Sequence, residues 1–128
     1  SSRDLLARGA AFRKLTRNGT SHVRHVWVPE PFTYLYWGVN PHDTASSSTR
    51  RIALRDVAGV TPGHASDVFA KHARPDTAHL CFTVQTSERS LDLEVVPSAT
   101  GREADAAFRD EWVDALRVAV DAARSGKR

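Results

Sequence analysis

The chain has 128 residues, 41% of them hydrophobic, which fits one globular domain with one core. Its 18 basic and 15 acidic residues give a formal net charge of +3 at pH 7. No apolar run approaches the roughly 18 residues that a membrane-spanning helix needs, and no signal peptide is recognisable. The single cysteine, Cys81, excludes an internal disulfide and indicates a reducing, intracellular compartment.

The charge is unevenly distributed along the chain. Residues 1–55 contain nine basic and three acidic residues, so the rest of the chain is net negative. Such polarity predicts either a basic pole that faces an anionic partner or a solvated charged surface. Because the sequence has no initiating Met and has polar ends, we expect it to be a domain of a longer parent protein.

Strand patterns dominate the first part of the chain. Residues 2–8 predict a helical turn that ends at Gly9. Asn18-Gly19 is a strong hairpin signal, and Pro29-Glu30-Pro31 ends the strand that follows it. Three strands of an antiparallel meander are therefore expected, at residues 10–17, 22–28 and 33–39.

Four more segments have strand character after a polar loop at residues 40–48. In the longer connection between the second and third of them, we expect a helical turn at residues 66–71. The third and fourth segments predict a final hairpin. The four expected strands are residues 49–54, 56–60, 79–85 and 89–96.

The end of the chain has the clearest pattern, an amphipathic helix at residues 100–124. Thr100 and Glu103 have the spacing of a capping box, and Arg124 suits the C-terminal end of the helix dipole. The apolar stripe predicts that Trp112 packs against the strands. The expected fold class is mainly β with one C-terminal helix: a seven-stranded barrel or orthogonal sandwich capped at one end.

The sequence resembles the pleckstrin homology (PH) domains, in particular those of the phospholipase C delta type. The resemblance implies a PH-like domain at residues 9–124, an N-terminal extension at 1–8 and a tail at 125–128. It runs from Gly9 to Ala123 and includes the central helical Trp112. The matching segments are residues 9–14, 24–28, 35–37, 60–69, 81–84 and 88–93.

The resemblance implies that this chain is a non-catalytic module that binds an anionic lipid headgroup or inositol phosphate. Lys14, Arg24 and Ser90 match headgroup-binding positions, while other basic positions of the family are replaced by uncharged residues or histidine. Arg17 and His22 beside the hairpin turn could replace part of the missing charge, as could other nearby arginines. We therefore expect weak or unspecific lipid binding.

A protein-interaction domain is the alternative, in which a partner protein or a second copy of the chain binds an aromatic face. If the second and third strands pair closely, Trp27 faces Tyr34 and His25 faces Tyr36 on the side opposite the core. This cluster would be a docking surface, or it would only stiffen the hairpin beneath residues 4–6.

An enzyme is the least favoured function class. The six histidines are scattered, and no nucleophile motif, phosphate-binding loop or carboxylate pair is recognisable, so we expect no catalytic site, metal or cofactor. The acidic second part of the chain disfavours nucleic acid. Cys81 is interpreted as a packing residue. We expect a cytoplasmic domain without a transmembrane segment, free or peripheral at a membrane or cytoskeletal structure.

Overall fold

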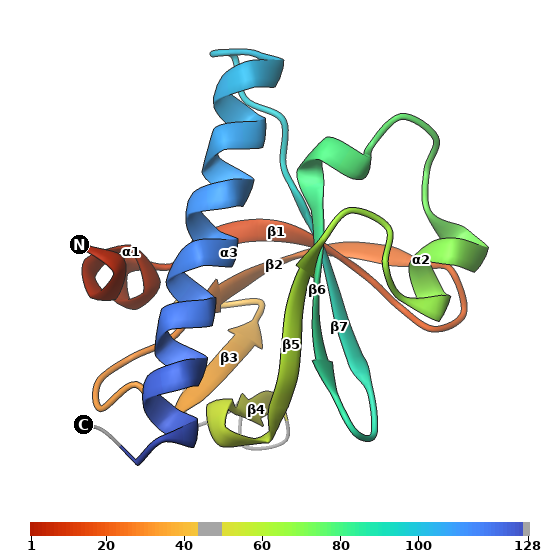
Figure 1. Cartoon of the computed structure of the whole chain (residues 1–128). Coiled ribbons are helices and arrows are strands. Elements are labelled where there is room, and N and C mark those ends of the chain that lie inside the picture. The colour runs from red at the N-terminus through yellow and green to blue at the C-terminus, as the bar shows by residue number, and fades with distance from the viewer. Residues whose placement is uncertain (44–49, 127–128) are drawn as a thin grey trace.

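A computed structural model describes residues 1–43 and 50–126 (Figure 1). Seven antiparallel strands form one sheet in the order β4-β3-β2-β1-β7-β6-β5, and the long helix α3 lies across it (Figure 1). The elements are α1 (Ser2–Arg8), β1 (Ala10–Leu15), β2 (Ser21–Trp27), β3 (Tyr34–Gly38), β4 (Arg51–Ala53), the 3-10 turn η1 (Leu54–Asp56), β5 (Val57–Pro62), α2 (Asp67–His72), the 3-10 turn η2 (Ala78–Leu80), β6 (Cys81–Thr86), β7 (Ser90–Val95) and α3 (Arg102–Arg124).

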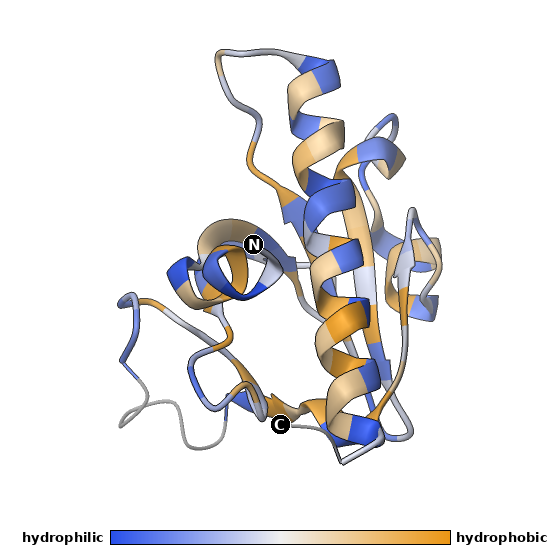
Figure 2. Ribbon diagram, turned by 60° about the vertical axis from the view of Figure 1, so that its left-hand side comes forward, coloured by the Kyte–Doolittle hydropathy of each residue, from blue (hydrophilic) through white to orange (hydrophobic). Residues whose placement is uncertain are grey.

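This architecture confirms the expected fold class, a PH-like sheet with a C-terminal helix. Strand β1 is central because it pairs with both β2 and β7. Its residue Phe12 is fully buried, with its ring edge-on to Phe82 and Trp112 at centroid distances of 5.5 Å and 5.0 Å. Trp112 is also fully buried, as its position in the apolar stripe predicted. Polar and apolar residues alternate along α3 (Figure 2).

The start of α3 differs from the predicted capping box. The helix begins at Arg102 after Gly101, which has a φ of 103° and no side chain that could cap the helix. The hydroxyl of Thr100 instead hydrogen-bonds the Ser98 hydroxyl at 2.5 Å. Asp105 holds the preceding loop by accepting hydrogen bonds from Ser98 N at 3.0 Å and Ser98 Oγ at 2.7 Å. These bonds lower the pKa of the Asp105 carboxyl.

Some predicted strand ends also shift. β1 ends at Leu15, two residues early, because Thr16 N donates to Thr20 O at 2.8 Å and closes the turn. Gly19 in this turn has a φ of 93°, which favours glycine. The predicted start of β6 is instead the turn η2. Part of the predicted loop at 40–48, and the predicted start of β4 at residue 49, lie outside the described residues.

Residues 1–8 are packed into the domain. Leu6 is 1% exposed and belongs to the core, and its carbonyl oxygen accepts a hydrogen bond from Val28 N at 2.8 Å. The chain then turns at Gly9, which has a φ of 74° and where a Cβ would lie 2.5 Å from Val26 O. Only glycine fits so close to β2. Helix α1 thereby lies beside α3 (Figures 1 and 2).

Helix α3 also covers the edge of β5, the last strand of the sheet. Arg117 Nε donates to Val60 O at 2.9 Å, and Arg124 Nη1 donates to Val57 O at 2.6 Å. Both carbonyl groups belong to a strand that, among residues 1–43 and 50–126, pairs with β6 alone. The two arginines occupy backbone acceptors that another strand would otherwise pair with, so they protect this edge from aggregation.

We predict that Trp112→Ala destabilises the domain by about 3–5 kcal/mol, because it leaves a cavity beside Phe12. Urea unfolding followed by circular dichroism should show a lower midpoint with a similar slope. Glu111→Ala is the control, since Glu111 is the exposed neighbour of Trp112 on the same helix. Equal midpoints for Trp112→Ala and the wild type would show that α3 does not anchor the core.

Candidate functional site

The inner face of the β1–β2 hairpin changes from apolar to basic along its length. In the β1–β2 register, Arg24 lies opposite Phe12, and His22 lies opposite Lys14. Residues directly opposite in an antiparallel pair project from the same face of the sheet. Lys14, His22 and Arg24 therefore share the face of Phe12 and continue it beyond the core. A core-lining face that ends in basic side chains is a candidate anion site.

Two more cations come close to Lys14 from other segments, namely Arg50, which precedes β4, and Arg89, in the β6–β7 turn. Burial lowers the pKa of the Lys14 ammonium; nearby Arg89, Arg24 and Arg50 also lower it, whereas Asp92 raises it. We call Lys14, Arg24, Arg50 and Arg89 the basic mouth. Its four cations outnumber the one nearby carboxylate, so it favours an anionic ligand.

The structure brings together only part of the predicted headgroup site. Lys14 and Arg24 belong to the basic mouth. Arg17 and His22 are both exposed, Arg17 in the β1–β2 turn and His22 beside it at the start of β2. Ser90 donates its hydroxyl hydrogen bond to Asp92 Oδ2 at 2.7 Å. Since it alternates with the core residue Leu91, Ser90 projects from the face opposite Lys14.

Arg89 was not among the predicted site residues. It is the residue before Ser90, which matched a family position, so adjacency was the only sequence signal for it. Arg50 is one of the other nearby arginines, and the sequence does not show on which side of the sheet it lies. Both residues lie outside the first hairpin, and strand periodicity cannot show that distant turns meet.

Asp92 is buried but bonded within the protein. Its Oδ1 accepts hydrogen bonds from Ser66 Oγ at 2.5 Å and Thr83 Oγ1 at 2.8 Å, in addition to the Ser90 bond on Oδ2. Ser66 also caps α2 by accepting from Phe69 N at 3.0 Å. This carboxylate therefore ties α2 to the sheet. Three hydroxyl donors satisfy it, so it neutralises the basic mouth only in part.

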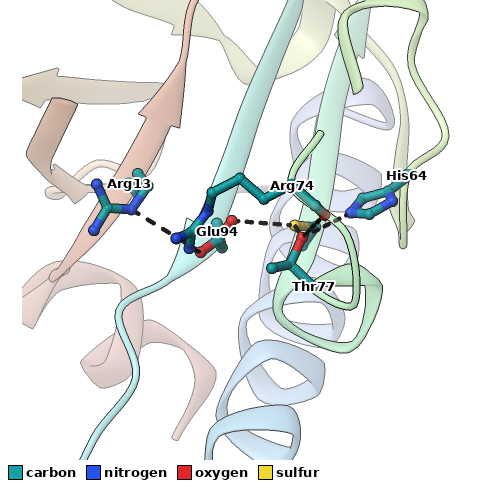
Figure 3. Close-up of polar contacts among 6 residues, drawn as sticks. Arg13, His64, Arg74, Thr77 and Glu94 are labelled. Carbon is teal, nitrogen blue, oxygen red and sulfur yellow. Dashed lines mark hydrogen bonds and ion pairs between the residues drawn. The ribbon is translucent and has the colours of Figure 1, made fainter. Parts of the chain in front are cut away.

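A second polar cluster on the outer face surrounds Glu94, which is 5% exposed (Figure 3). Arg74 forms an ion pair with Glu94 Oε2, and Arg13 Nε lies 4.0 Å from the same oxygen. Thr77 Oγ1 is within hydrogen-bond distance of His64 Nε2 at 3.0 Å and accepts from Cys81 Sγ at 3.7 Å (Figure 3). Arg13 thus has a counterion on this face and does not add to the basic mouth.

The predicted outer aromatic face is largely closed. Trp27 projects, as predicted, from the face of β2 opposite to that of the core residue Val26. Its side chain is nevertheless only 1% exposed. Its ring stacks on Tyr36 at a centroid distance of 5.9 Å and meets His42 at 5.6 Å. Of the two interpretations, Trp27 as part of a docking surface is therefore wrong, because these two rings and the chain at Gly9 cover it.

The predicted pairing of this face is also wrong by two residues. Trp27 pairs with Tyr36 and His25 pairs with Gly38, because the chain between β2 and β3 is longer than a tight turn. Tyr34 is half-buried, with Arg51 Cζ 4.3 Å from its ring centroid. The even shift keeps each residue on its predicted face.

No protein-family model and no curated protein sequence matches the chain. A solved structure, Inner Membrane Complex Sub-compartment Protein 1 from Toxoplasma gondii, is similar over 94% of this chain and 88% of that chain, with a TM-score of 0.66 and 17% identity. Sub-compartment Protein 3 from the same organism covers 91% and 82%, with a TM-score of 0.48 and 13% identity. The first likeness supports the fold alone. Within the described residues, no helix combines the length and apolar character of a membrane span.

We predict that the Cys81 thiol is unreactive in the folded domain at neutral pH. Cys81 is buried, and burial raises the pKa of its thiol to about 12 from the ordinary 9.0. The folded state therefore retains a proton that the unfolded state loses above its own pKa, so this thiol's contribution to stability declines as pH rises from about 9 to about 12. Reaction with a disulfide reagent should be slow in buffer and fast in urea. Fast reaction without denaturant would contradict the burial.

We predict that Trp27→Ala destabilises the domain by about 3–5 kcal/mol, the range for buried large aromatic residues. Thermal unfolding should show a clearly lower melting temperature than that of the wild type. The matched control is Val23→Ala on the same face of β2, because Val23 is 48% exposed. A variant with unchanged stability but altered self-association would restore the interpretation of Trp27 as a docking residue.

Proposed function

We propose that this domain is a non-catalytic recognition module whose basic mouth binds phosphate groups of an anionic membrane lipid. The observation that carries the proposal is that Arg24, Arg50 and Arg89 all come close enough to Lys14, beside the core, to lower the pKa of its ammonium. A phosphate would offset their mutual repulsion and favour the charged form of Lys14. The resemblance to phosphoinositide-binding PH domains supports the same ligand chemistry.

The proposed binding is weak and has low specificity. Lys14 and Arg24 are at the matching family positions, but Ser90 is bonded to Asp92. The β1–β2 turn and the start of β2 add only exposed Arg17 and exposed His22. Each missing hydrogen bond to a charged phosphate group lowers the binding free energy by about 1.5–3 kcal/mol. A few direct phosphate contacts give attraction to anionic surfaces more readily than discrimination between headgroup isomers.

In a longer parent protein, such a domain would direct the protein to a membrane surface by peripheral association. The similar Toxoplasma protein is named for an inner membrane complex, and a membrane-associated role for the present chain is part of this proposal. Attraction to the surface would extend over about a Debye length, which is roughly 8 Å at physiological salt.

We predict that Lys14→Ala/Arg24→Ala abolishes co-sedimentation with phosphatidylcholine vesicles that contain phosphatidylinositol bisphosphate. The double variant removes the two cations of the hairpin that face the basic mouth. The wild type should bind these vesicles at low salt and less at high salt, because surface attraction is screened. The melting temperature should change little, since neither residue belongs to the hydrophobic core.

Arg55→Ala/Arg102→Ala is the matched control, because it removes two exposed arginines from other parts of the domain. It should retain nearly all of the binding if position matters more than net charge. Equal losses for both double variants would indicate general charge attraction. Absence of wild-type binding at low salt would overturn the lipid proposal.

The second candidate function is protein interaction through the outer face of β2 and β3. Its supporting observation is that His25, Tyr34 and Tyr36 are only half-buried on that face. Because Trp27 is covered, the available aromatic surface is smaller than the sequence indicated. Self-association measured by analytical ultracentrifugation for the wild type and Tyr34→Ala tests this alternative. An unchanged monomer in both would count against self-association through this face.

A further inference from the structure

One aromatic ring joins two cations of the basic mouth. Lys14 Nζ lies 5.7 Å and Arg89 Cζ lies 5.2 Å from the ring centroid of Trp37. Trp37 is on β3 and only 7% exposed, so core packing holds its indole in place. A cation near the face of an indole is attracted by the quadrupole of the ring. Trp37 therefore links β1 to the β6–β7 turn, which are far apart in sequence.

Arg89 is held through both its backbone and its side chain. Its carbonyl oxygen accepts a hydrogen bond from Thr86 N at 2.9 Å, and its N–H donates to Thr86 Oγ1 at 3.1 Å. At the other end, Nη2 donates to Arg51 O at 2.7 Å. These bonds and the Trp37 ring restrict the guanidinium to one region beside Lys14. Less conformational entropy would then be lost when it binds a ligand.

Among the described residues, the guanidinium of Arg89 has no carboxylate partner, unlike those of three other arginines. Arg13 and Arg74 share Glu94, and Arg109 pairs with Asp110. Within residues 1–43 and 50–126, no carboxylate lies within ion-pair distance of Arg89, and its Nε and Nη1 make no hydrogen bond. An exposed guanidinium with free donors can bind two oxygens of one phosphate.

We propose that Arg89 is a phosphate-binding residue of the basic mouth and that Trp37 is a positioning residue which holds Arg89 and Lys14 toward the same headgroup. This inference rests on the proposed function and extends it to the β6–β7 turn, which the predicted site residues did not include. The ligand would lie between the β1–β2 hairpin and this turn. Arg17, at the exposed tip of the hairpin, would contribute less than Arg89.

The first test compares single-charge variants in binding to phosphatidylcholine vesicles that contain phosphatidylinositol bisphosphate. Arg89→Ala should weaken binding by about tenfold or more, the effect of losing a hydrogen bond to a charged group. Arg89→Lys should weaken vesicle binding less than Arg89→Ala, because it retains the charge but not the planar donor pair. Arg17→Ala should also weaken vesicle binding less than Arg89→Ala. Arg55→Ala is the control for loss of one exposed arginine.

The positioning role of Trp37 is tested by a double-mutant cycle. Trp37→Phe keeps an apolar ring but weakens its attraction for a cation. If Trp37 acts through Arg89, the loss in the Trp37→Phe/Arg89→Ala double variant should be smaller than the product of the two single losses. For Trp37→Phe combined with Arg55→Ala, the loss of affinity should equal the product of the two single losses. A purely structural effect of Trp37 would make both pairs independent, which would overturn its positioning role.

Soluble inositol hexakisphosphate, added as a competitor, distinguishes a free phosphate ligand from a lipid surface. Competition that depends on Arg89 would support phosphate recognition by this residue, whereas direct binding of inositol hexakisphosphate without vesicle binding would reassign the source to a soluble ligand. If the wild type binds neither probe, the proposed function fails and this inference fails with it. If the wild type binds and Arg89→Ala binds as well as Arg55→Ala, the inference alone is overturned.

Discussion

The packing of Phe12 against Trp112 is the interaction on which the rest of the structure depends. Phe12 lies on the one strand that pairs with both β2 and β7, and its ring contacts residues from the sheet and from α3. Removing these aromatic surfaces from water provides a large share of the hydrophobic stabilisation of a small domain. The two parts of the sheet and the helix therefore share one core at Phe12.

The same arrangement positions the candidate site. Two residues after Phe12, the inner face continues with Lys14 beyond the buried core, and Trp37 forms the boundary between the two regions. Lys14 at this boundary is partly desolvated, which strengthens its interaction with an anion compared with a fully hydrated surface charge. The core thus both stabilises the fold and supplies the low-polarity side of the basic mouth.

The two buried carboxylates of β7 explain why only some of the cations are available. Glu94 has Arg13 and Arg74 as partners on the outer face, whereas Asp92 accepts three hydroxyl hydrogen bonds and has no arginine within ion-pair distance in the described part of the chain. Two carboxylates two residues apart on β7 therefore have different roles. Glu94 forms an ion-paired cluster, and Asp92 anchors α2 through hydroxyl hydrogen bonds. The uncompensated positive charge remains on the inner face.

The amino-acid pattern alone predicted the strands in chain order, the terminal helix and the burial of Trp112, because these follow from local periodicity. Matched family positions named Lys14 and Arg24 as site candidates. The tertiary structure decided which distant segments meet. Arg89 joins Lys14 only because Trp37 lies between them, and Trp27 is buried only because Tyr36, His42 and the chain at Gly9 cover it. Alternation along a strand indicates the face on which a side chain projects, but what covers that face depends on loops whose paths are set by packing across the whole domain.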